Sequence, residues 1–178
     1  MVLVRPITEN DIGGFHAALD SVARESNFLR SDAAPPIDAV ASFVRQNIES
    51  QNPQVVAVDE QHGVVGWCDI VRARGRHENH VGELGMGIVA DWRGRGIGRQ
   101  LLVDTIAAAD ISNFLRIELS VHSDNHKAIA LYRRFGFVDE GRKLRARMRN
   151  SGTVDIFLMA RLRPEQFWPG GESKTHLS

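Results

Sequence analysis

The feature that most constrains this chain is a run of glycines and arginines, Arg93-Gly94-Arg95-Gly96-Ile97-Gly98-Arg99, between a strand pattern and a helix pattern. Glycines without a Cβ let successive backbone N–H groups converge on one anion, and the start of a helix adds the positive end of its dipole. Arginine side chains add charge-assisted hydrogen bonds. The run predicts a pyrophosphate site; the alternative is an ordinary glycine-rich turn with exposed arginines.

Two common nucleotide-binding loops do not fit this run. A Walker loop ends in Gly-Lys followed by Ser or Thr, whereas Gly98 is followed by Arg99 and Gln100. A Rossmann fingerprint needs Gly-x-Gly-x-x-Gly near the first strand of its unit, and the spacing Gly94-x-Gly96-x-Gly98 differs from it. The sequence therefore argues against a P-loop NTPase and against NAD binding.

The hydrophobic pattern predicts a single α/β domain. Continuous or alternating apolar runs predict strands at residues 2–7, 55–58, 64–71, 80–89 and 115–121, and helical spacing predicts helices at residues 12–25, 37–48, 96–109 and 125–135. Alternation around Asn150-Ser151-Gly152 predicts an antiparallel hairpin over residues 143–158. Because 178 residues suit one core, we expect one domain over residues 1–163 and a flexible tail over 164–178, pinned by its aromatic residues.

Composition excludes several classes of protein. Lys plus Arg and Asp plus Glu number 22 each, so no net field favours nucleic acid or an anionic membrane. The one cysteine, Cys68, excludes an intramolecular disulfide and is interpreted as a small buried hydrophobe. No apolar run approaches the ~18 residues of a membrane helix, and the start resembles no signal peptide, so we expect a cytoplasmic protein. His77 and His80 lack further ligands at zinc spacing, and no metal is expected.

Two motifs together point to a family. The chain contains Arg93-x-x-Gly96-x-Gly98 and, directly after a predicted strand, Asn125-x-x-Ala128-x-x-Leu131-Tyr132-x-x-Phe135-Gly136-Phe137. Both motifs, and the order of predicted elements, resemble the GNAT superfamily of N-acetyltransferases, in particular its bacterial small-molecule branch. The resemblance implies an α/β (α+β) fold with a mixed central sheet of about seven strands flanked by helices. It also implies a V-shaped split between strands four and five, which correspond to residues 80–89 and 115–121.

The resemblance implies acetyl-CoA as cosubstrate, without a metal. The pantetheine arm would pair with backbone at Ile88 and Val89, and the pyrophosphate would lie on the amides from Arg95 to Arg99, with Arg93 at the entrance of the loop. Asn125 and Ala128 would face the lower pantetheine. The residues implied in cofactor binding are Ile88, Val89, Arg93, Gly94, Arg95, Gly96, Ile97, Gly98, Arg99, Asn125 and Ala128.

The implied chemistry is direct attack of a neutral amine on the thioester. A backbone N–H near Val89 would polarise the carbonyl. Tyr132 matches the family tyrosine that donates to the CoA sulfur, and a phenol with a pKa near ~10 keeps its proton at neutral pH. The alternative is a core aromatic residue on an amphipathic helix.

Glu83 is the candidate base. It lies six residues before Val89, the spacing at which histone-acetylating relatives carry a glutamate that deprotonates the amine. The alternatives are an exposed strand carboxylate and a water chain without a dedicated base. Relatives that acetylate ribosomal proteins carry a glutamate five residues before the motif asparagine; Ser120 stands there in this chain, which argues against that branch.

Three further groups are candidates for the acceptor side. His122 follows the fifth predicted strand, just before Asn125, and is a minor candidate for lining the acceptor site. By position, relatives build a lid from the end of the first helix, here Arg24, Glu25, Asn27, Phe28 and Leu29. Lys143, Arg145, Arg147 and Arg149 alternate along one strand, as a solvated face or as a surface for an acidic substrate.

The resemblance implies an acetyl-CoA-dependent N-acetyltransferase acting on the primary amine of a small molecule: an amino acid, a polyamine or an amine-bearing toxin. The alternatives are a protein lysine or N-terminal acetyltransferase and a noncatalytic acyl-CoA sensor. The expected partners are acetyl-CoA and a small amine, with no nucleic acid or membrane, and homodimers are common in the family. Tyr132 and Glu83 favour catalysis over sensing.

Overall fold

A computed structural model describes residues 1–169 except 26–27, 30, 76 and 150–151. Within these residues seven strands form one sheet in the order β1-β2-β3-β4-β5-β7-β6, and only the β4–β5 pair is parallel. The strands are β1 (Val2–Pro6), β2 (Gln54–Asp59), β3 (Gly63–Arg72), β4 (Val81–Ile88), β5 (Arg116–His122), β6 (Val138–Arg149) and β7 (Gly152–Leu162). The predicted mixed seven-stranded sheet is confirmed.

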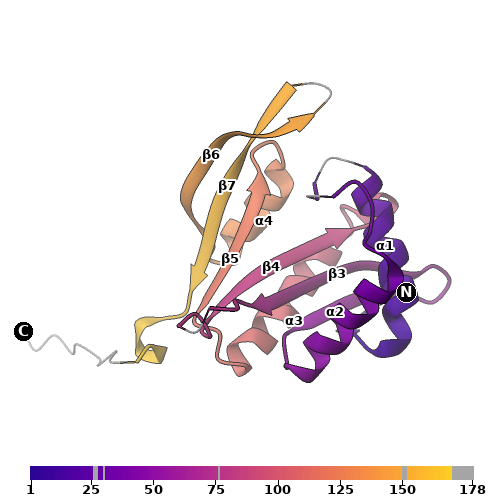
Figure 1. Ribbon diagram of the computed structural model, residues 1–178, viewed down its shortest axis with the longest axis horizontal. Helices are drawn as coiled ribbons and strands as arrows, with labels where there is room; N and C mark the ends of the chain where they lie inside the picture. The colour runs from indigo at the N-terminus through magenta and orange to yellow at the C-terminus, as the bar shows by residue number, and fades with distance from the viewer. Residues whose placement is uncertain (26–27, 30, 76, 150–151, 170–178) are drawn as a thin grey trace, which may run out of the picture.

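Four helices cover the two faces of this sheet (Figure 1). They are α1 (Ile12–Arg24), α2 (Ile37–Glu49), α3 (Ile97–Ile111) and α4 (His126–Arg134). Helices α1 and α2 bury one apolar cluster against β2 and β3, whereas α3 and α4 bury a larger one on the opposite face. The predicted order of elements is confirmed.

A capping box at Thr8 begins the short 3-10 helix Glu9–Asp11 that leads into α1. The Thr8 backbone N–H and hydroxyl both donate to Asp11 Oδ2 at 2.8 Å. Arg5 of β1 donates to both oxygens of the same carboxylate, at 2.7 and 2.8 Å. The guanidinium and the Thr8 bonds hold the pKa of Asp11 at about 2, so the start of α1 is fixed to the first strand at neutral pH.

Strands β4 and β5 pair over only three positions and then separate. The pairs are Val81–Arg116, Gly82–Ile117 and Glu83–Glu118. Beyond them β4 stays paired to β3 and β5 stays paired to β7, so the two strands diverge as a V (Figure 1). The predicted split is confirmed, and the Glu83–Glu118 pair forms its vertex.

Glycines in β4 serve internal packing as well as the split. A Cβ on Gly82 would clash with Ile70 and Phe114, and a Cβ on Gly87 would clash with the ring of Trp67. These two glycines therefore let large core side chains lie against the β4 backbone.

In the described part of the C-terminal segment, Trp168 contacts residues that flank the ends of β4 and β7. The indole Nε1 of Trp168 donates to Arg163 O at 2.9 Å, and its ring meets the ring of His80 at 5.6 Å. Arg163 lies over Phe167 at 4.3 Å. Residues 170–178 of the expected tail lie outside the described residues.

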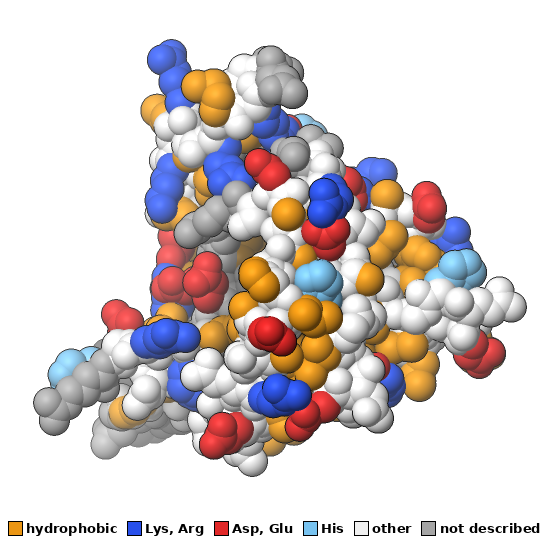
Figure 2. Space-filling model, turned by 45° about the vertical axis from the view of Figure 1, so that its right-hand side comes forward, with side chains coloured by type: hydrophobic (Ala, Val, Ile, Leu, Met, Phe, Trp, Pro, Cys, Tyr) orange, Lys and Arg blue, Asp and Glu red, His pale blue; other side chains and the backbone are white. Residues whose placement is uncertain are grey.

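The surface mixes charges of both signs. Figure 2 shows Lys and Arg side chains interspersed with Asp and Glu on one face, in keeping with 22 residues of each sign. Across the part of the chain that is described, no helix is long and apolar enough to cross a membrane.

Candidate active site

The glycine-rich loop presents open backbone amides at the start of α3. Gly94 and Gly96 have φ of +77° and +80°, and a Cβ on either would meet nothing within 4 Å. Arg99 and Gln100 donate their backbone N–H groups to Gly96 O, and no side chain caps the helix. The first N–H groups of α3, at Ile97 and Gly98, have no carbonyl within the helix, so the loop is built to receive an anion.

Gly98 lies where three cofactor-binding elements of the prediction converge. A Cβ there would stand 3.3 Å from Ile88 Cδ1 and 3.3 Å from Leu131 Cδ2. The end of β4, the start of α3 and the middle of α4 therefore meet at one point. The residues predicted to bind one cofactor are brought together by this convergence.

Arg93 braces the loop. Its Nε donates to Ile88 O at 2.8 Å, and its Nη1 and Nη2 donate to Glu25 at 2.7 and 2.5 Å. Its guanidinium also lies 5.3 Å from the centre of the Phe28 ring. These contacts make Arg93 a positioning residue at the entrance of the loop.

Two other arginines of the loop face solvent. Arg95 is exposed and lies over the Trp92 ring at 4.7 Å, and Arg99 is exposed on the first turn of α3. Their guanidinium groups are therefore accessible to phosphate oxygens at the open amides.

The backbone pairing of β4 shows which amide near Val89 is available. The N–H of Val89 donates to Val65 O at 3.0 Å, within the β3–β4 pairing. Backbone groups on successive residues of a strand face opposite edges, so the N–H of Ile88 faces the split. The amide available to polarise a carbonyl in the split is therefore that of Ile88.

Tyr132 is buried on α4, facing the core. Its side chain is 7 % exposed, and its ring centre lies 5.8 Å from that of Phe137. Burial, with the nearby Cys68 thiol, raises the pKa of Tyr132 well above its usual range. Among the described residues its hydroxyl makes no hydrogen bond, so the phenol keeps its proton and has it to donate.

Asn125 caps α4. Its Oδ1 accepts a hydrogen bond from the N–H of Ala128 at 3.2 Å. This bond fixes the orientation of the side-chain amide and leaves its Nδ2 as a donor. The three-residue spacing of Asn125 and Ala128 in the second motif therefore has a structural reason, the cap of α4, in addition to the predicted role of both residues in pantetheine binding.

Glu83 lies at the vertex of the split. Its side chain is exposed and borders a cavity of about 280 Å³. Arg116 forms ion pairs there with Glu118 and Glu140. The cavity is lined by Glu83, Arg116, Glu118, Leu119, Ser120, Glu140, Leu158 and Met159. Since carboxylates outnumber the single arginine among these residues, the cavity favours a cationic group.

Asp69 is a carboxylate that the sequence interpretation did not assign to the site. It lies on β3 directly opposite Gly85 of β4, and it is 7 % exposed. Burial, with the charge of Glu83, raises the pKa of Asp69 to about 7. The signal in the sequence was a charged residue within an otherwise apolar strand. Its neighbour Cys68 is fully buried, as predicted, and burial raises the pKa of that thiol.

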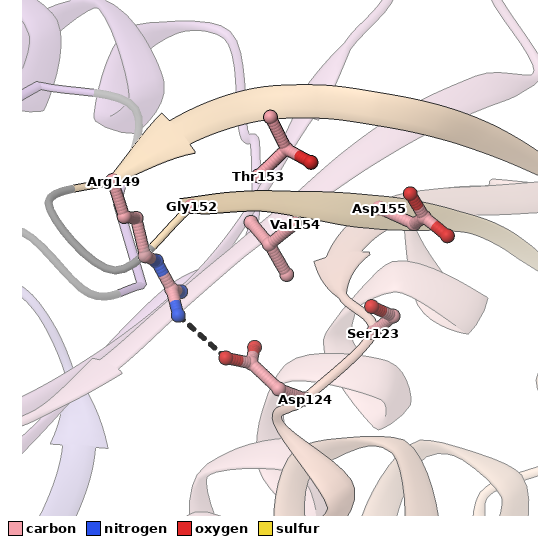
Figure 3. Close-up of a pocket in the computed structure, with 7 residues that line it drawn as sticks. All are labelled: Ser123, Asp124, Arg149, Gly152, Thr153, Val154 and Asp155. Atoms are coloured by element: carbon pink, nitrogen blue, oxygen red, sulfur yellow. Dashed lines mark hydrogen bonds and ion pairs between the residues drawn. The ribbon is translucent and has the colours of Figure 1, made fainter.

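His122 lies at the open end of β5, remote from the vertex. It is buried, and its Nδ1 lies 2.6 Å from Arg149 Nη2. Arg149 also pairs with Asp124 at 2.5 Å beside a second cavity of about 270 Å³ (Figure 3). This cavity is lined by Ser123, Asp124, Arg149, Gly152, Thr153, Val154 and Asp155.

The segment after α1 reaches the strand pair β6–β7. Arg147 of β6 donates to Leu29 O at 2.7 Å, and Glu25 holds Arg93 as described. Arg24 instead pairs with Asp20 on its own helix. The expected lid residue Asn27 lies outside the described residues.

The predicted solvated basic face on β6 is wrong for two of its members. Arg147 and Arg149 are half-buried, whereas Met148 is 80 % exposed. The β6–β7 register shifts between Lys143 and Arg147, and Arg145 has a φ of +49°. This irregularity breaks the regular alternation and turns the last two arginines toward the body of the protein.

Within the described ranges, no group of three or more His, Cys, Asp and Glu side chains is placed to hold a metal ion.

Comparison with known proteins identifies the family. The model of the acetyltransferase (GNAT) family matches residues 17–137. The L-amino acid N-acetyltransferase AaaT of Escherichia coli is 35% identical over 103 residues, which cover 56% of this chain and 62% of that protein. The N-alpha-acetyltransferase RimI of Mycobacterium tuberculosis is 32% identical over 139 residues, which cover 75% of this chain and 78% of that protein. The chain belongs to the GNAT acetyltransferase family.

Solved structures share the fold. A phosphinothricin acetyltransferase from Sinorhizobium meliloti, in complex with acetyl-CoA, has a TM-score of 0.83 and 21% identity, covering 92% of this chain and 89% of that one. A putative acetyltransferase, yncA of Salmonella typhimurium, with its cofactor acetyl-CoA, has a TM-score of 0.83 and 17% identity, covering 90% and 93%. At these identities the likeness establishes the fold.

Proposed function

We propose that this chain is an acetyl-CoA-dependent N-acetyltransferase that acts on the primary amine of a small molecule, with L-amino acids as the first acceptor class to test. The observation that carries this proposal is that one face of the split presents open backbone amides and the other presents carboxylates. The open amides of Ile97 and Gly98 suit an anionic donor on one face. The carboxylates around Glu83 suit a cationic acceptor on the other face.

The residues present fit acetyl-CoA. The exposed guanidinium groups of Arg95 and Arg99, with the amides of Gly96 to Gly98, would hold the pyrophosphate. The amide of Ile88 and Nδ2 of Asn125 would hold the pantetheine and the thioester carbonyl. The acetyl-CoA complexes of the Sinorhizobium and Salmonella structural neighbours support this choice.

When bound, the cosubstrate supplies an acetyl group activated as a thioester. In this proposal Glu83 takes a proton from the acceptor nitrogen, and the Ile88 N–H stabilises charge on the carbonyl oxygen. Tyr132 gives its phenolic proton to the departing sulfur. The high pKa of Tyr132 keeps that proton in place until negative charge develops on sulfur.

Three observations bear on the acceptor. The sequence likeness to the Escherichia coli L-amino acid N-acetyltransferase supports an amino acid. The likeness to RimI favours a second candidate, the N-terminus of a protein. The contact between Arg147 and Leu29 O supports the small acceptor, because it joins the segment after α1 to β6 on the acceptor side.

A thiol-release assay tests the proposal. The enzyme, acetyl-CoA and each of the twenty L-amino acids are combined, with the N-acetylated amino acid as matched control and with free N-terminal peptides, polyamines and phosphinothricin in parallel. Amine-dependent CoA release with a free amino acid, absent with its N-acetylated form, is expected. Release with peptides alone would support the second candidate. Calorimetric binding of acetyl-CoA without any release would support a sensor and overturn the proposal.

A further inference from the structure

Asp69 is a buried carboxyl group that the described residues leave unpaired. It stands in the middle of β3, between β2 and β4, and is 7 % exposed. Among the described residues its carboxylate makes neither a hydrogen bond nor an ion pair. Buried carboxylates are ordinarily paired, because desolvation disfavours an isolated charge. A buried carboxylate without a partner points to a cationic partner from outside the chain.

The carboxylate points into a hollow made by a missing side chain. A Cβ on Gly85 would stand 3.2 and 3.3 Å from the two oxygens of Asp69, so these oxygens lie over the Gly85 Cα. Glu83 lies two residues earlier on the same face of β4, and it is paired with Glu118 of β5. Asp69 therefore shares the face of the sheet on which the vertex carboxylates lie.

The nearby guanidinium of Arg116 is already paired with other carboxylates. Arg116 is held by Glu118 and Glu140, whose contacts raise its pKa. The charge of Glu83 acts on Asp69 as a like charge and, with burial, raises the pKa of Asp69 to about 7. Asp69, which is buried, and Glu83, which borders the cavity, thus form a pair of like-charged carboxylates, and among the described residues no arginine is paired with either.

We propose that Asp69 binds the ammonium group of the acceptor and, together with Glu83, receives the two protons that the acceptor nitrogen loses. This inference rests on the proposed function and adds a second carboxylate to the acceptor site. An ammonium ion between two carboxylates would donate a hydrogen bond to each and offset one of their two negative charges.

The protons and electron pairs balance in this scheme. The acceptor ammonium gives one proton to Asp69, and its lone pair then forms the C–N bond at the thioester carbonyl. The C–S bond breaks, and the sulfur takes a proton from Tyr132. The nitrogen gives its second proton to Glu83. Both carboxylates return their protons to water, one proton restores Tyr132, and the net release is one proton for each amide formed.

Kinetics of Asp69→Asn test this role. Asparagine keeps the size of the side chain and removes its charge. We expect kcat/KM for the acceptor to fall about 10- to 100-fold, while the calorimetric Kd for acetyl-CoA changes less than about twofold. Asp104→Asn, an exposed aspartate on α3, is the matched control and should retain wild-type kinetics. Wild-type kcat/KM in Asp69→Asn, with amino-acid turnover intact, would overturn the inference and leave the proposed function standing.

A second variant displaces the carboxylate without removing its charge. In Gly85→Ala the new methyl group would crowd both oxygens of Asp69. We expect the acceptor KM to rise while acetyl-CoA affinity is retained. An unchanged acceptor KM in this variant would contradict the position assigned to the ammonium.

A binding measurement tests the site even without turnover. In protein labelled with ¹³C at aspartate carboxyl carbons and saturated with CoA, the Asp69 resonance, assigned through Asp69→Asn, is followed at pH 7 during titration with methylammonium chloride. A saturable shift is expected, with none from tetramethylammonium chloride, which cannot donate a hydrogen bond. If no amine in the panel is acetylated but this shift occurs, the proposed function fails and the amine site stands. If the resonance does not move, the amine site is overturned.

Discussion

The guanidinium of Arg93 donates two hydrogen bonds to the carboxylate of Glu25 and thereby joins the glycine-rich loop to the end of α1. Its Nη1 and Nη2 lie 2.7 and 2.5 Å from the two carboxylate oxygens, and its Nε reaches Ile88 O at 2.8 Å. One side chain therefore links the loop, the end of β4 and the end of α1. The open amides are held in place before any anion arrives, which lowers the ordering cost of binding.

Arg93→Lys tests this bracing role. A lysine has one ammonium group in place of the planar fork and cannot satisfy Glu25 and Ile88 O together. We expect the calorimetric Kd for acetyl-CoA to rise about tenfold, which corresponds to about 1.4 kcal/mol. Glu25→Gln should give a smaller rise, because Nε keeps its contact with Ile88 O. A lowered melting temperature with unchanged acetyl-CoA affinity would limit Arg93 to structural stabilisation.

Gly96→Ala should impair anion binding at the loop. The φ of +80° costs a residue with a Cβ about 1–2 kcal/mol, and the added methyl group occupies the open space beside the first amides of α3. We expect acetyl-CoA binding to weaken at least tenfold by calorimetry. Gly63→Ala, at a φ of +71° in the β2–β3 turn, carries the same strain outside the Gly94–Gly98 run. It should lower stability similarly and retain acetyl-CoA binding; equal losses of binding in both variants would contradict the loop assignment.

Tyr132→Phe separates catalysis from core packing. The hydroxyl makes no hydrogen bond among the described residues, so its removal breaks no contact within the protein and should leave the melting temperature within about 2 °C. A donor to the leaving sulfur acts mainly in the transition state, so kcat should fall about 100-fold with little change in acetyl-CoA affinity. An unchanged kcat would mean that Tyr132 contributes only to core packing and is not the proton donor.

The sequence predicted what depends on local patterns. The strand and helix periods and both motifs lie within short stretches of chain, and the fold and the convergence around Gly98 follow from them. The partner of Arg93 could not be predicted, because Glu25 is 68 residues away in the sequence. Such pairs depend on which elements meet in space.

The sequence pattern also could not predict which edge of a strand a given N–H faces, or where the pairing of a strand becomes irregular. Whether the N–H of Val89 or of Ile88 faces the split depends on the register of β4 against β3. The inward turn of Arg147 depends on the register shift in β6. The role of Asp69 could not be predicted for a related reason. Its carboxylate lies over Gly85 of the neighbouring strand, and the sequence does not show that these two residues face each other.

The stability of the protein should depend on pH through Asp69. Its pKa is about 7 in the folded protein, raised by burial and by Glu83, against its ordinary 3.8. Between these values the folded state binds more protons than the unfolded state, so the free energy of unfolding contributed by this group falls as pH rises from about 4 to about 7. Since one pKa unit corresponds to about 1.4 kcal/mol, the ionised carboxylate costs up to about 4 kcal/mol above pH 7.

Asp69→Asn removes this titration. The variant should therefore melt several degrees above the wild type at pH 8, and the difference should shrink to near zero as pH falls to about 4. Melting curves of both proteins at half-unit steps from pH 4 to pH 8 measure it, with Asp104→Asn as the control whose difference stays flat. A constant difference between Asp69→Asn and wild type across this range would mean that Asp69 does not take up a proton there. If Asp69→Asn is more stable than the wild type at pH 8 but turns over the acceptor more slowly, the charge of Asp69 lowers the stability of the protein and is needed for its activity.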